Sequence, residues 1–547
     1  MTSLKLHTAI YSLIMLSLIE SPLIAQKKFN SSPTLHKEGT ATQLIVEDKP
    51  FLVLGGETGN SSGSDIRYMK SVWKAVKALN LNTVLVPIYW ELLEPEKGRF
   101  DFSLVDSLIK DARQHNLKLA FLWFGSWKNS MSCYVPAWIK KDYKTYPRAY
   151  DKNGIAQEIL SPFSPNNLQA DIAAFSALMK HIKETDENYH TVIMIQVENE
   201  IGMLPDARDY HPQATRELNG EVPKELIQHI QKNKKTLASA LLKAWESTGF
   251  KTSGNWEAVF GKSLATDEIF IAWYFAKYTN RVTEEGKKIY PIPMFVNAAL
   301  NRPNVKPGDY PSGGPLPHII DIWKVAAPAI DFLSPDFYNP DFKHWNDLYK
   351  RNDNPLFIPE IRFDSSVYAK VFYAVGHYHA MGFSPFSIES AATPEHQPLG
   401  QSYNVLTQLS SLIAAHQGKS TMNGSLVDKT IPADTLTFGE YTFTIKHDYT
   451  LGWSPDAKKD AWPHGGVTII QVAADEFMIA GTGVVITFSS ATDKSRVGIL
   501  TIEEGTYNDS KWTPGRVLNG DQSHQGRHLR FPAGHIGIQR LVLYKYK

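Results

Sequence analysis

Two carboxylates follow short apolar runs in this 547-residue sequence, and such a pair can do acid–base and nucleophilic chemistry. The run Val192–Val197 leads to Glu200, and the run Leu356–Ile358 leads through Pro359 to Glu360. Short apolar runs bounded by polar residues predict strands that are buried on both faces. A carboxylate buried at the end of such a strand is unfavourable unless another group compensates its charge or it takes part in binding or catalysis. Hydrolysis of a glycosidic bond uses a pair of carboxyl residues, and here two different strands would each position one of them.

The two carboxylates are assigned different roles. We predict Glu200 as the general acid/base and Glu360 as the nucleophile, with Arg362 helping to keep Glu360 ionised. Asn199 is placed to hold a sugar 2-hydroxyl, a contact that strengthens in the transition state. Carboxyl groups ~5–5.5 Å apart would retain configuration, and ~6.5–9.5 Å apart would invert it. The competing interpretation is that residues 198–200 only end the strand.

Other polar and aromatic residues stand at the ends of the predicted strands, and we expect them to line the pocket. Each alone is equally explained by packing, but together they fit a sugar site with aromatic walls and a few aimed polar groups. Tyr338 is expected to donate a hydrogen bond to Glu360. The predicted substrate-binding residues, besides Asn199, are Glu57, Tyr89, Trp90, Glu91, Trp123, Trp127, Asn297, Tyr338 and Glu389. The histidines show no metal-ligand spacing, so neither a metal nor a cofactor is expected.

Eight strand candidates alternate with amphipathic helical stretches, the pattern of a (β/α)8 barrel. They are Phe51–Leu54, Thr83–Ile88, Leu117–Phe124, Val192–Val197, Pro293–Asn297, Phe332–Phe337, Leu356–Ile358 and Phe383–Ile388. An α/β barrel places its active site at the carboxyl ends of its strands, where both carboxylates fall. A doubly wound open sheet is the alternative, but no G-x-G-x-x-G follows the first strand.

The chain divides into four predicted segments. Residues 1–25 are predicted as a signal peptide, with a short apolar stretch and a cleavage site after Ala25, and a buried N-terminal helix is the alternative. Residues 26–40 are predicted as a linker and 41–420 as the barrel, with a long helical insertion between the fourth and fifth strands. Residues 421–547 carry recurring short β runs and turn signals, which predict an antiparallel β-sandwich.

The composition limits the classes of binding partner and the cellular location that we expect. The formal net charge of +1 gives no reason to expect nucleic acid or a membrane surface. The single cysteine, Cys133, excludes an intrachain disulfide. Export without disulfides predicts a periplasmic or secreted bacterial protein. The expected partner is a carbohydrate substrate, and the sequence leaves the oligomeric state open, a homodimer included.

Several motifs resemble the family 35 glycoside hydrolases and, more loosely, family 42. The family signature GLNTV…W…HEP…G.FDF is matched by LNTV at Leu81–Val84, YWELLEP at Tyr89–Pro95 and GRFDF at Gly98–Phe102. The acid/base motif QVENEYG is matched by QVENEIG at Gln196–Gly202. Both families carry the acid/base after strand four and the nucleophile after strand seven. The resemblance thus implies a retaining exo-β-glycosidase, a β-galactosidase first of all, and the C-terminal sandwich resembles the accessory domain of a bacterial branch of family 35.

Two segments depart from the family pattern. Phe124–Ser130 replaces the loop that usually grips galactose hydroxyls, and Gly55-Gly56-Glu57 replaces the usual Gly-Gly-Ser. These departures leave the sugar open between galactose and glucose. The alternatives are therefore a β-glucoside- or β-glucan-active hydrolase or transglycosylase and, from another class, a carbohydrate-binding protein without catalysis.

Overall fold

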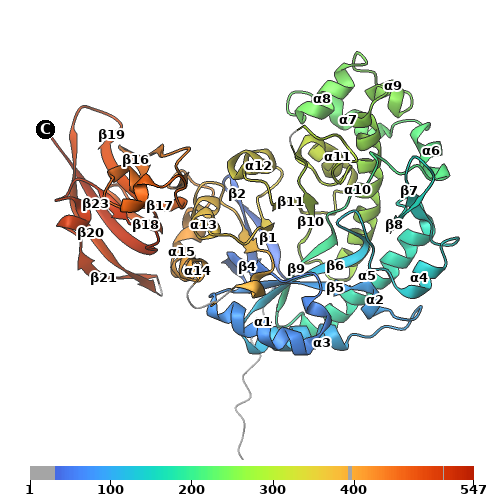
Figure 1. Ribbon diagram of the computed structural model, residues 1–547, viewed down its shortest axis with the longest axis horizontal. Helices are drawn as coiled ribbons and strands as arrows, with labels where there is room; N and C mark the ends of the chain where they lie inside the picture. The colour runs from blue at the N-terminus through green and yellow to red at the C-terminus, as the bar shows by residue number, and fades with distance from the viewer. Residues whose placement is uncertain (1–30, 303, 392, 394–396, 509) are drawn as a thin grey trace, which may run out of the picture.

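The structure is a computed structural model that describes residues 31–302, 304–391, 393, 397–508 and 510–547, and eight parallel strands close a barrel at its centre (Figure 1). In order around the barrel these are β4 (Val53–Glu57), β5 (Thr83–Tyr89), β6 (Lys118–Lys128), β9 (Val192–Asn199), β10 (Met294–Ala299), β11 (Phe332–Phe337), β12 (Ile358–Ile361) and β13 (Gly382–Pro385). Gly382 of β13 pairs in parallel with Val53 of β4, which closes the ring. The predicted (β/α)8 barrel is confirmed, on the eight predicted segments, and an open sheet is excluded.

Helices surround the barrel, and a four-helix insertion follows β9. The surrounding helices are α1 (Ile66–Ala78), α2 (Trp90–Leu93), α3 (Ser103–Gln114), α4 (Ala137–Lys141), α5 (Pro165–Asp186), α10 (Leu264–Ile289), α11 (Ile320–Ala326), α12 (Phe342–Tyr349), α13 (Val367–Gly376), α14 (Pro398–Gln408) and α15 (Ser410–His416). The insertion comprises α6 (Pro212–Leu218), α7 (Lys224–Lys232), α8 (Ser239–Glu246) and α9 (Trp256–Phe260). It forms a separate lobe beside α11 (Figure 1).

Side chains alternate along each barrel strand between the barrel interior and the layer of helices. On β6, Leu122 and Phe124 belong to the cluster inside the barrel, whereas Phe121 and Trp123 pack in the cluster between barrel and helices. On β11, Phe332 belongs to the inner cluster and Leu333 to the outer one. This alternation decides which side chains reach the mouth of the barrel.

A three-stranded sheet covers the amino-terminal end of the barrel. It consists of β1 (Thr34–Glu38), β2 (Ala41–Val46) and β3 (Lys49–Phe51), and Leu44 of β2 packs with the inner cluster. The prediction of a linker over 26–40 is therefore wrong for 34–38, where β1 pairs with β2. The predicted signal peptide, 1–25, lies outside the described residues. Within the described ranges, every helix is too short or too polar to cross a bilayer.

Two antiparallel sheets form the C-terminal sandwich. The larger contains β14 (Met422–Val427), β17 (Gly465–Ala473), β18 (Glu476–Thr482), β23 (Gly537–Tyr546), β20 (Arg496–Asn508) and β21 (Lys511–Val517). The smaller contains β15 (Ala433–Phe438), β16 (Tyr441–His447), β19 (Val484–Ser490) and β22 (Leu529–Phe531). The larger sheet docks on α13 so closely that a Cβ on Gly466 would stand 2.1 Å from the Ala369 carbonyl oxygen.

Candidate active site

Glu200 and Glu360 meet at the carboxyl ends of the fourth and seventh barrel strands. Glu200 directly follows β9 and Glu360 lies within β12. One carboxylate oxygen of each residue, together with one of Asp336, lies within 4.8 Å of the others. The side chains are almost wholly buried, with 5% of Glu200 and 6% of Glu360 exposed. This approach of the oxygens agrees with the ~5–5.5 Å separation of carboxyl groups at which one of them acts as nucleophile.

The backbone of Glu200 is held in an unusual conformation by its neighbours. Its φ is 45°, in the left-handed region that a non-glycine residue adopts at a cost. The Glu200 amide donates to Asn297 Oδ1 at 3.0 Å, and Ser130 Oγ donates to the Glu200 carbonyl at 2.8 Å. Asn129 Nδ2 donates to the Glu200 carboxylate. The predicted site residue Asn297 therefore positions Glu200.

The carboxylate of Glu360 is positioned by a hydrogen bond from a tyrosine. The Tyr338 hydroxyl donates to Glu360 Oε1, as predicted. Burial and the Glu200 carboxylate raise the pKa of Glu360 to about 8, whereas the Tyr338 hydrogen bond and the Lys128 ammonium lower it. The expected role of Arg362 is corrected: its guanidinium lies 5.7 Å from the centre of the Tyr338 ring, and the cation that acts on Glu360 is Lys128.

Two further carboxyls complete the cluster. Glu57 ends β4 with neither oxygen hydrogen-bonded within the described structure, and its pKa is raised by burial and then by Glu360. Asp336 of β11 accepts from Asn297 Nδ2 at 2.6 Å, and burial followed by the charges of Glu360 and Glu200 raises its pKa. Glu57 was predicted as a site residue and Asp336 was not.

Lys128 is the cation of the site. Its ammonium donates to Asn199 Oδ1 at 2.8 Å and also to Asn129. Asn199 is fully buried, and its Nδ2 has no partner among the described residues, so it retains a free donor. Lys128 and Asn129, neither predicted from the sequence as site residues, thereby join Asn199 to Glu200 in one hydrogen-bonded chain.

The carboxylate trio could also hold a cation. Among the residues that the structure describes, Glu200, Asp336 and Glu360 are the one group of three such side chains close enough to share a metal ion. The Lys128 ammonium already supplies positive charge to this cluster. Glycoside hydrolysis by two carboxyls needs no metal.

Three predicted aromatic contacts are corrected. Trp90, Trp123 and Trp127 are each fully buried in the layer between barrel and helices. Their indole N–H groups are already used, by Glu94 at 2.8 Å, Asp171 at 3.0 Å and the Leu160 carbonyl at 3.1 Å. They therefore support the barrel and do not line its mouth, because they occupy outward-facing positions.

The remaining predicted residues differ in their placement. Tyr89 faces inward and donates to the Asn60 carbonyl at 2.7 Å, so it forms a wall of the barrel. Glu91 is partly exposed in an ion pair with Lys140 at 2.9 Å and is not among the groups that shift the pKa of Glu360, which corrects its assignment. Glu389 accepts from the Gly59 amide at 2.8 Å and raises the pKa of Glu57, so it lies at the edge of the cluster.

Behind the site, Glu198 and Asp171 form a second buried carboxyl pair. Glu198 accepts from the Trp127 amide at 2.9 Å, and burial followed by the Asp171 charge raises its pKa. Asp171 accepts from Trp123 Nε1, Ser126 Oγ and Tyr278 Oη at 3.0, 2.6 and 3.1 Å. Three donors thus serve Asp171, whereas Glu198 Oε1 has no hydrogen-bond partner among the described residues. This pair ties α5 and α10 to the strands that carry the site.

Asp171→Ala is expected to lower the free energy of unfolding by about 3–5 kcal/mol, because it leaves buried donors without an acceptor. Chemical denaturation monitored by tryptophan fluorescence measures the change. Asp460→Ala, at an exposed aspartate, is the control and should change stability by less than about 0.5 kcal/mol. Equal stability of the Asp171 variant and wild type would contradict this account of the network.

Tyr338→Phe is expected to move the acid limb of the kcat/KM profile to higher pH, by about one unit. Glu360 must be ionised to attack, so activity falls as the pH drops through its pKa. Removing a hydrogen bond that favours the ionised form raises that pKa. Rates with an aryl glycoside from about pH 4 to pH 9 measure the shift. Tyr143→Phe, at an exposed tyrosine, should leave the profile unchanged, and an unmoved limb in Tyr338→Phe would contradict the assignment.

A (β/α)8 barrel with opposed carboxyls after its fourth and seventh strands defines the glycosidase class of site. Residues 43–267 match Glycosyl hydrolases family 35, which confirms the resemblance predicted from the motifs. The match includes Glu200 and ends before Glu360. The assignment of Glu360 as the second carboxylate therefore depends on the geometry of the site. Residues 399–530 match a domain of unknown function, DUF5597.

Relatives with known names match part of the chain. A β-galactosidase from Xanthomonas manihotis is 28% identical over 213 residues, which are 38% of this chain and 32% of that protein. The chain thus spans about a third of the length of this curated relative. Solved β-galactosidases from Bacillus circulans sp. alkalophilus and Rahnella sp. R3 are each 15% identical, with TM-scores of 0.45 and 0.46. The aligned regions cover 66% and 72% of this chain and 57% and 58% of theirs.

Proposed function

We propose that this protein is a retaining exo-β-glycosidase that releases terminal β-galactose from oligosaccharides or polysaccharide side chains. The observation that carries the proposal is the pair Glu200 and Glu360, whose oxygens lie within 4.8 Å in a barrel whose first half matches family 35. A purely binding protein has no need of two opposed, buried carboxyls. Galactose is proposed because the matched curated relative is a β-galactosidase.

In the first step of the proposed mechanism, a Glu360 oxygen attacks the anomeric carbon while the bond to the leaving oxygen breaks. Glu200 gives its proton to that oxygen, so the leaving group departs as a neutral alcohol. Tyr338 and Lys128 favour the ionised form of Glu360 that makes this attack. The free Nδ2 of Asn199 is the proposed donor to the sugar 2-hydroxyl.

In the second step, the Glu200 carboxylate takes a proton from water as the water oxygen bonds to the anomeric carbon. The bond to Glu360 breaks, which returns Glu360 to its ionised form and Glu200 to its protonated form. Two inversions give net retention. If a sugar hydroxyl took the place of water, the galactosyl group would be transferred to that sugar. The altered loop at 124–130 leaves this transglycosylase reaction open as an alternative.

A panel of aryl β-glycosides tests the proposal, with the galactoside and glucoside foremost. We expect cleavage of the galactoside with a β-anomeric first product, observed by proton NMR. An α-anomeric first product would contradict the retaining mechanism. Turnover of the glucoside alone would replace galactose by glucose and attribute the change to Glu57 and the loop at 124–130.

We also propose that the protein is exported to the periplasm or beyond. The support is the sequence of residues 1–25, which has the three-part pattern of a signal peptide. N-terminal sequencing of the protein from a bacterial expression host tests this, with Gln26 as the expected first residue. A first residue at Met1 would contradict it. A homodimer is the oligomeric state to be tested by light scattering.

A further inference from the structure

Strand β6 makes a large bulge against β9 just before the active site. The pairing of the two strands is regular as far as Val197 of β9 and resumes at Asn199. Between these points β9 contains Glu198 alone, whereas β6 contains residues 124–127. Bulges often lie beside active sites, where they redirect the side chains that follow. The bulge of β6 therefore determines where residues 128–130 lie.

The side chain of Glu198 occupies this bulge. Its carboxyl is fully buried and accepts from the Trp127 amide at 2.9 Å. A Cβ on Gly125 would stand 2.8 Å from Glu198 Oε1, so the bulge closes on the carboxyl and leaves no room for a larger residue at 125. Val197 packs against the helices, so alternation would send residue 198 into the barrel, but its φ of 63° breaks that alternation. This left-handed backbone places the carboxyl in the bulge.

The three residues after the bulge all bond to the end of β9. The Asn129 amide donates to the Asn199 carbonyl at 3.2 Å. The Asn129 side chain donates to the Glu200 carboxylate, and Ser130 Oγ donates to the Glu200 carbonyl at 2.8 Å. Lys128 Nζ donates to Asn199 Oδ1 at 2.8 Å. The positions of Asn199 and Glu200 therefore depend on the shape of the bulge.

We propose that Glu198 is a positioning residue, whose carboxyl keeps the bulge of β6 in the shape that brings residues 128–130 to the acid/base Glu200. The inference rests on the proposed function, which gives Glu200 its role as proton donor. Glu198 is not one of the three carboxyls that lie within 4.8 Å of one another, so it acts through its neighbours. Misplacement of a group by about 1 Å can lower a rate by about 10²-fold, so a small change in the bulge has a large effect.

Two variants disturb the bulge in different ways. Glu198→Ala removes the acceptor of the Trp127 amide and leaves a void in the bulge. Gly125→Ala keeps the carboxyl and presses a methyl group against it, so it tests the inference even where Glu198→Ala does not fold. Glu198→Gln is the conservative variant, because its side-chain carbonyl can still accept from the Trp127 amide.

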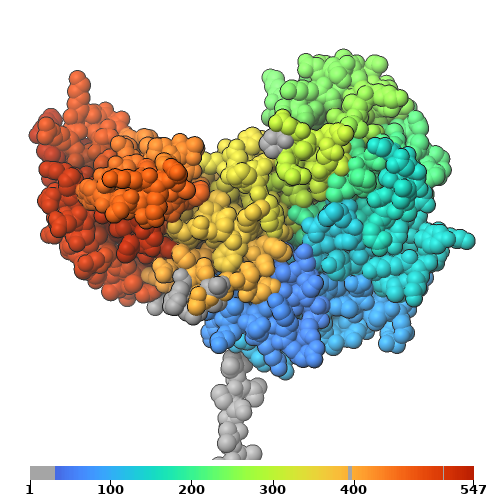
Figure 2. All heavy atoms as spheres, in the orientation of Figure 1, coloured from blue at the N-terminus to red at the C-terminus, as the bar shows by residue number. Residues whose placement is uncertain are grey.

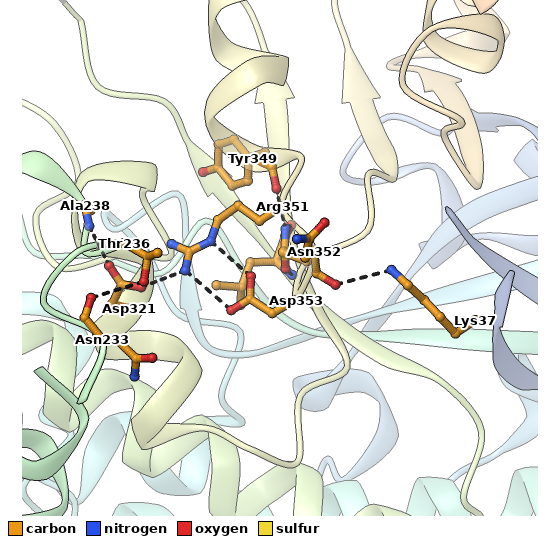
Figure 3. A network of polar contacts seen from close by, with 11 residues as sticks. Lys37, Asn233, Thr236, Ala238, Asp321, Tyr349, Arg351, Asn352 and Asp353 are labelled. Carbon is orange, nitrogen blue, oxygen red and sulfur yellow. Dashed lines mark hydrogen bonds and ion pairs between the residues drawn. The ribbon is translucent and has the colours of Figure 1, made fainter. Parts of the chain in front are cut away.

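Two buried aspartates that accept from backbone amides elsewhere are the matched controls. Asp186 ends α5, before β9 begins, and accepts from the Val192 amide at 2.7 Å. Asp321 of α11 accepts from the Ala238 amide of the insertion at 2.7 Å (Figure 3). The insertion is the green lobe of the space-filling view (Figure 2). Asp186→Ala and Asp321→Ala thus each remove a backbone anchor that is not part of the bulge.

The rate measured is kcat/KM for two aryl β-glycosides of the sugar that the wild type cleaves, one with a dinitrophenyl and one with a methoxyphenyl leaving group. Dinitrophenolate departs without a proton, so misplacement of Glu200 slows mainly the methoxyphenyl substrate. We expect Glu198→Ala and Gly125→Ala to lower kcat/KM at least about tenfold more for the methoxyphenyl than for the dinitrophenyl substrate. Glu198→Gln and both controls should keep the wild-type ratio of the two rates. Equal losses on the two substrates in Glu198→Ala or Gly125→Ala, or a changed ratio in a control, overturn the inference.

Crystal structures of the variants test the same inference without turnover. The bond from Asn129 to Glu200 should be lost in Glu198→Ala and Gly125→Ala and kept in Glu198→Gln. Residues 128–130 in their wild-type position in Glu198→Ala or Gly125→Ala would overturn it. Failure of the proposed function has a different signature, since the wild type would cleave no aryl β-glycoside while the crystal structures still showed the dependence on Glu198.

Discussion

Glu360→Gln is expected to lower kcat on an aryl β-galactoside by more than about 10⁴-fold, because the amide cannot form the covalent intermediate. The effect should be as large for good leaving groups as for poor ones, since attack by residue 360 is required for both. Steady-state kinetics with aryl galactosides of differing leaving-group pKa measure it. Glu91→Gln, at a surface glutamate after another strand, is the control and should keep wild-type activity.

Azide distinguishes a lost nucleophile from a damaged site. In Glu360→Ala the vacated space admits azide, which attacks the anomeric carbon from the side of residue 360 and should yield the α-galactosyl azide. Near-normal turnover by Glu360→Gln would remove Glu360 from the mechanism. A β-configured azide product from Glu360→Ala would exchange the roles of the two carboxyls.

The barrel was predictable because its strands are short apolar runs bounded by polar residues. Each run was interpreted as a buried strand. The runs that lead to Glu200 and Glu360 were the fourth and the seventh along the chain, as in the structure. The Tyr338–Glu360 hydrogen bond was predictable for the same reason, since neighbouring parallel strands β11 and β12 bring their ends together.

The misassigned tryptophans show what the apolar runs do not reveal. The run at 117–124 predicted a strand end beside Trp123, but β6 continues to Lys128. The residues at the true end, Lys128 and Asn129, are the ones that reach Asn199 and Glu200. Alternation along β6 sends Trp123 toward the helices, and only the register of the barrel fixes that direction.

Asp336 could have been identified from the sequence as a site residue, but it was counted only as part of a predicted strand. It is an ionisable residue inside the apolar run Phe332–Phe337, where a charge is unfavourable unless it is used. The insertion is a different case: residues 224–247 form two helices, α7 and α8, with a break between them at 233–238. That break follows from tertiary packing against α11, through the bond from the Ala238 amide to Asp321.

Glu200→Gln is expected to slow cleavage of galactosides with poor leaving groups by about 10²–10⁴-fold, the contribution of a positioned acid. With a dinitrophenyl leaving group the first step needs no proton, so the galactosyl–enzyme should form in a burst and then hydrolyse slowly. In Glu200→Ala azide should speed the second step and give the β-galactosyl azide, because it enters from the face that Glu200 occupied. Stopped-flow absorbance and NMR of the azide product measure both. Equal losses for good and poor leaving groups would contradict an acid at this position and would indicate that Glu200, with its strained backbone held by Asn297 and Ser130, only shapes the site.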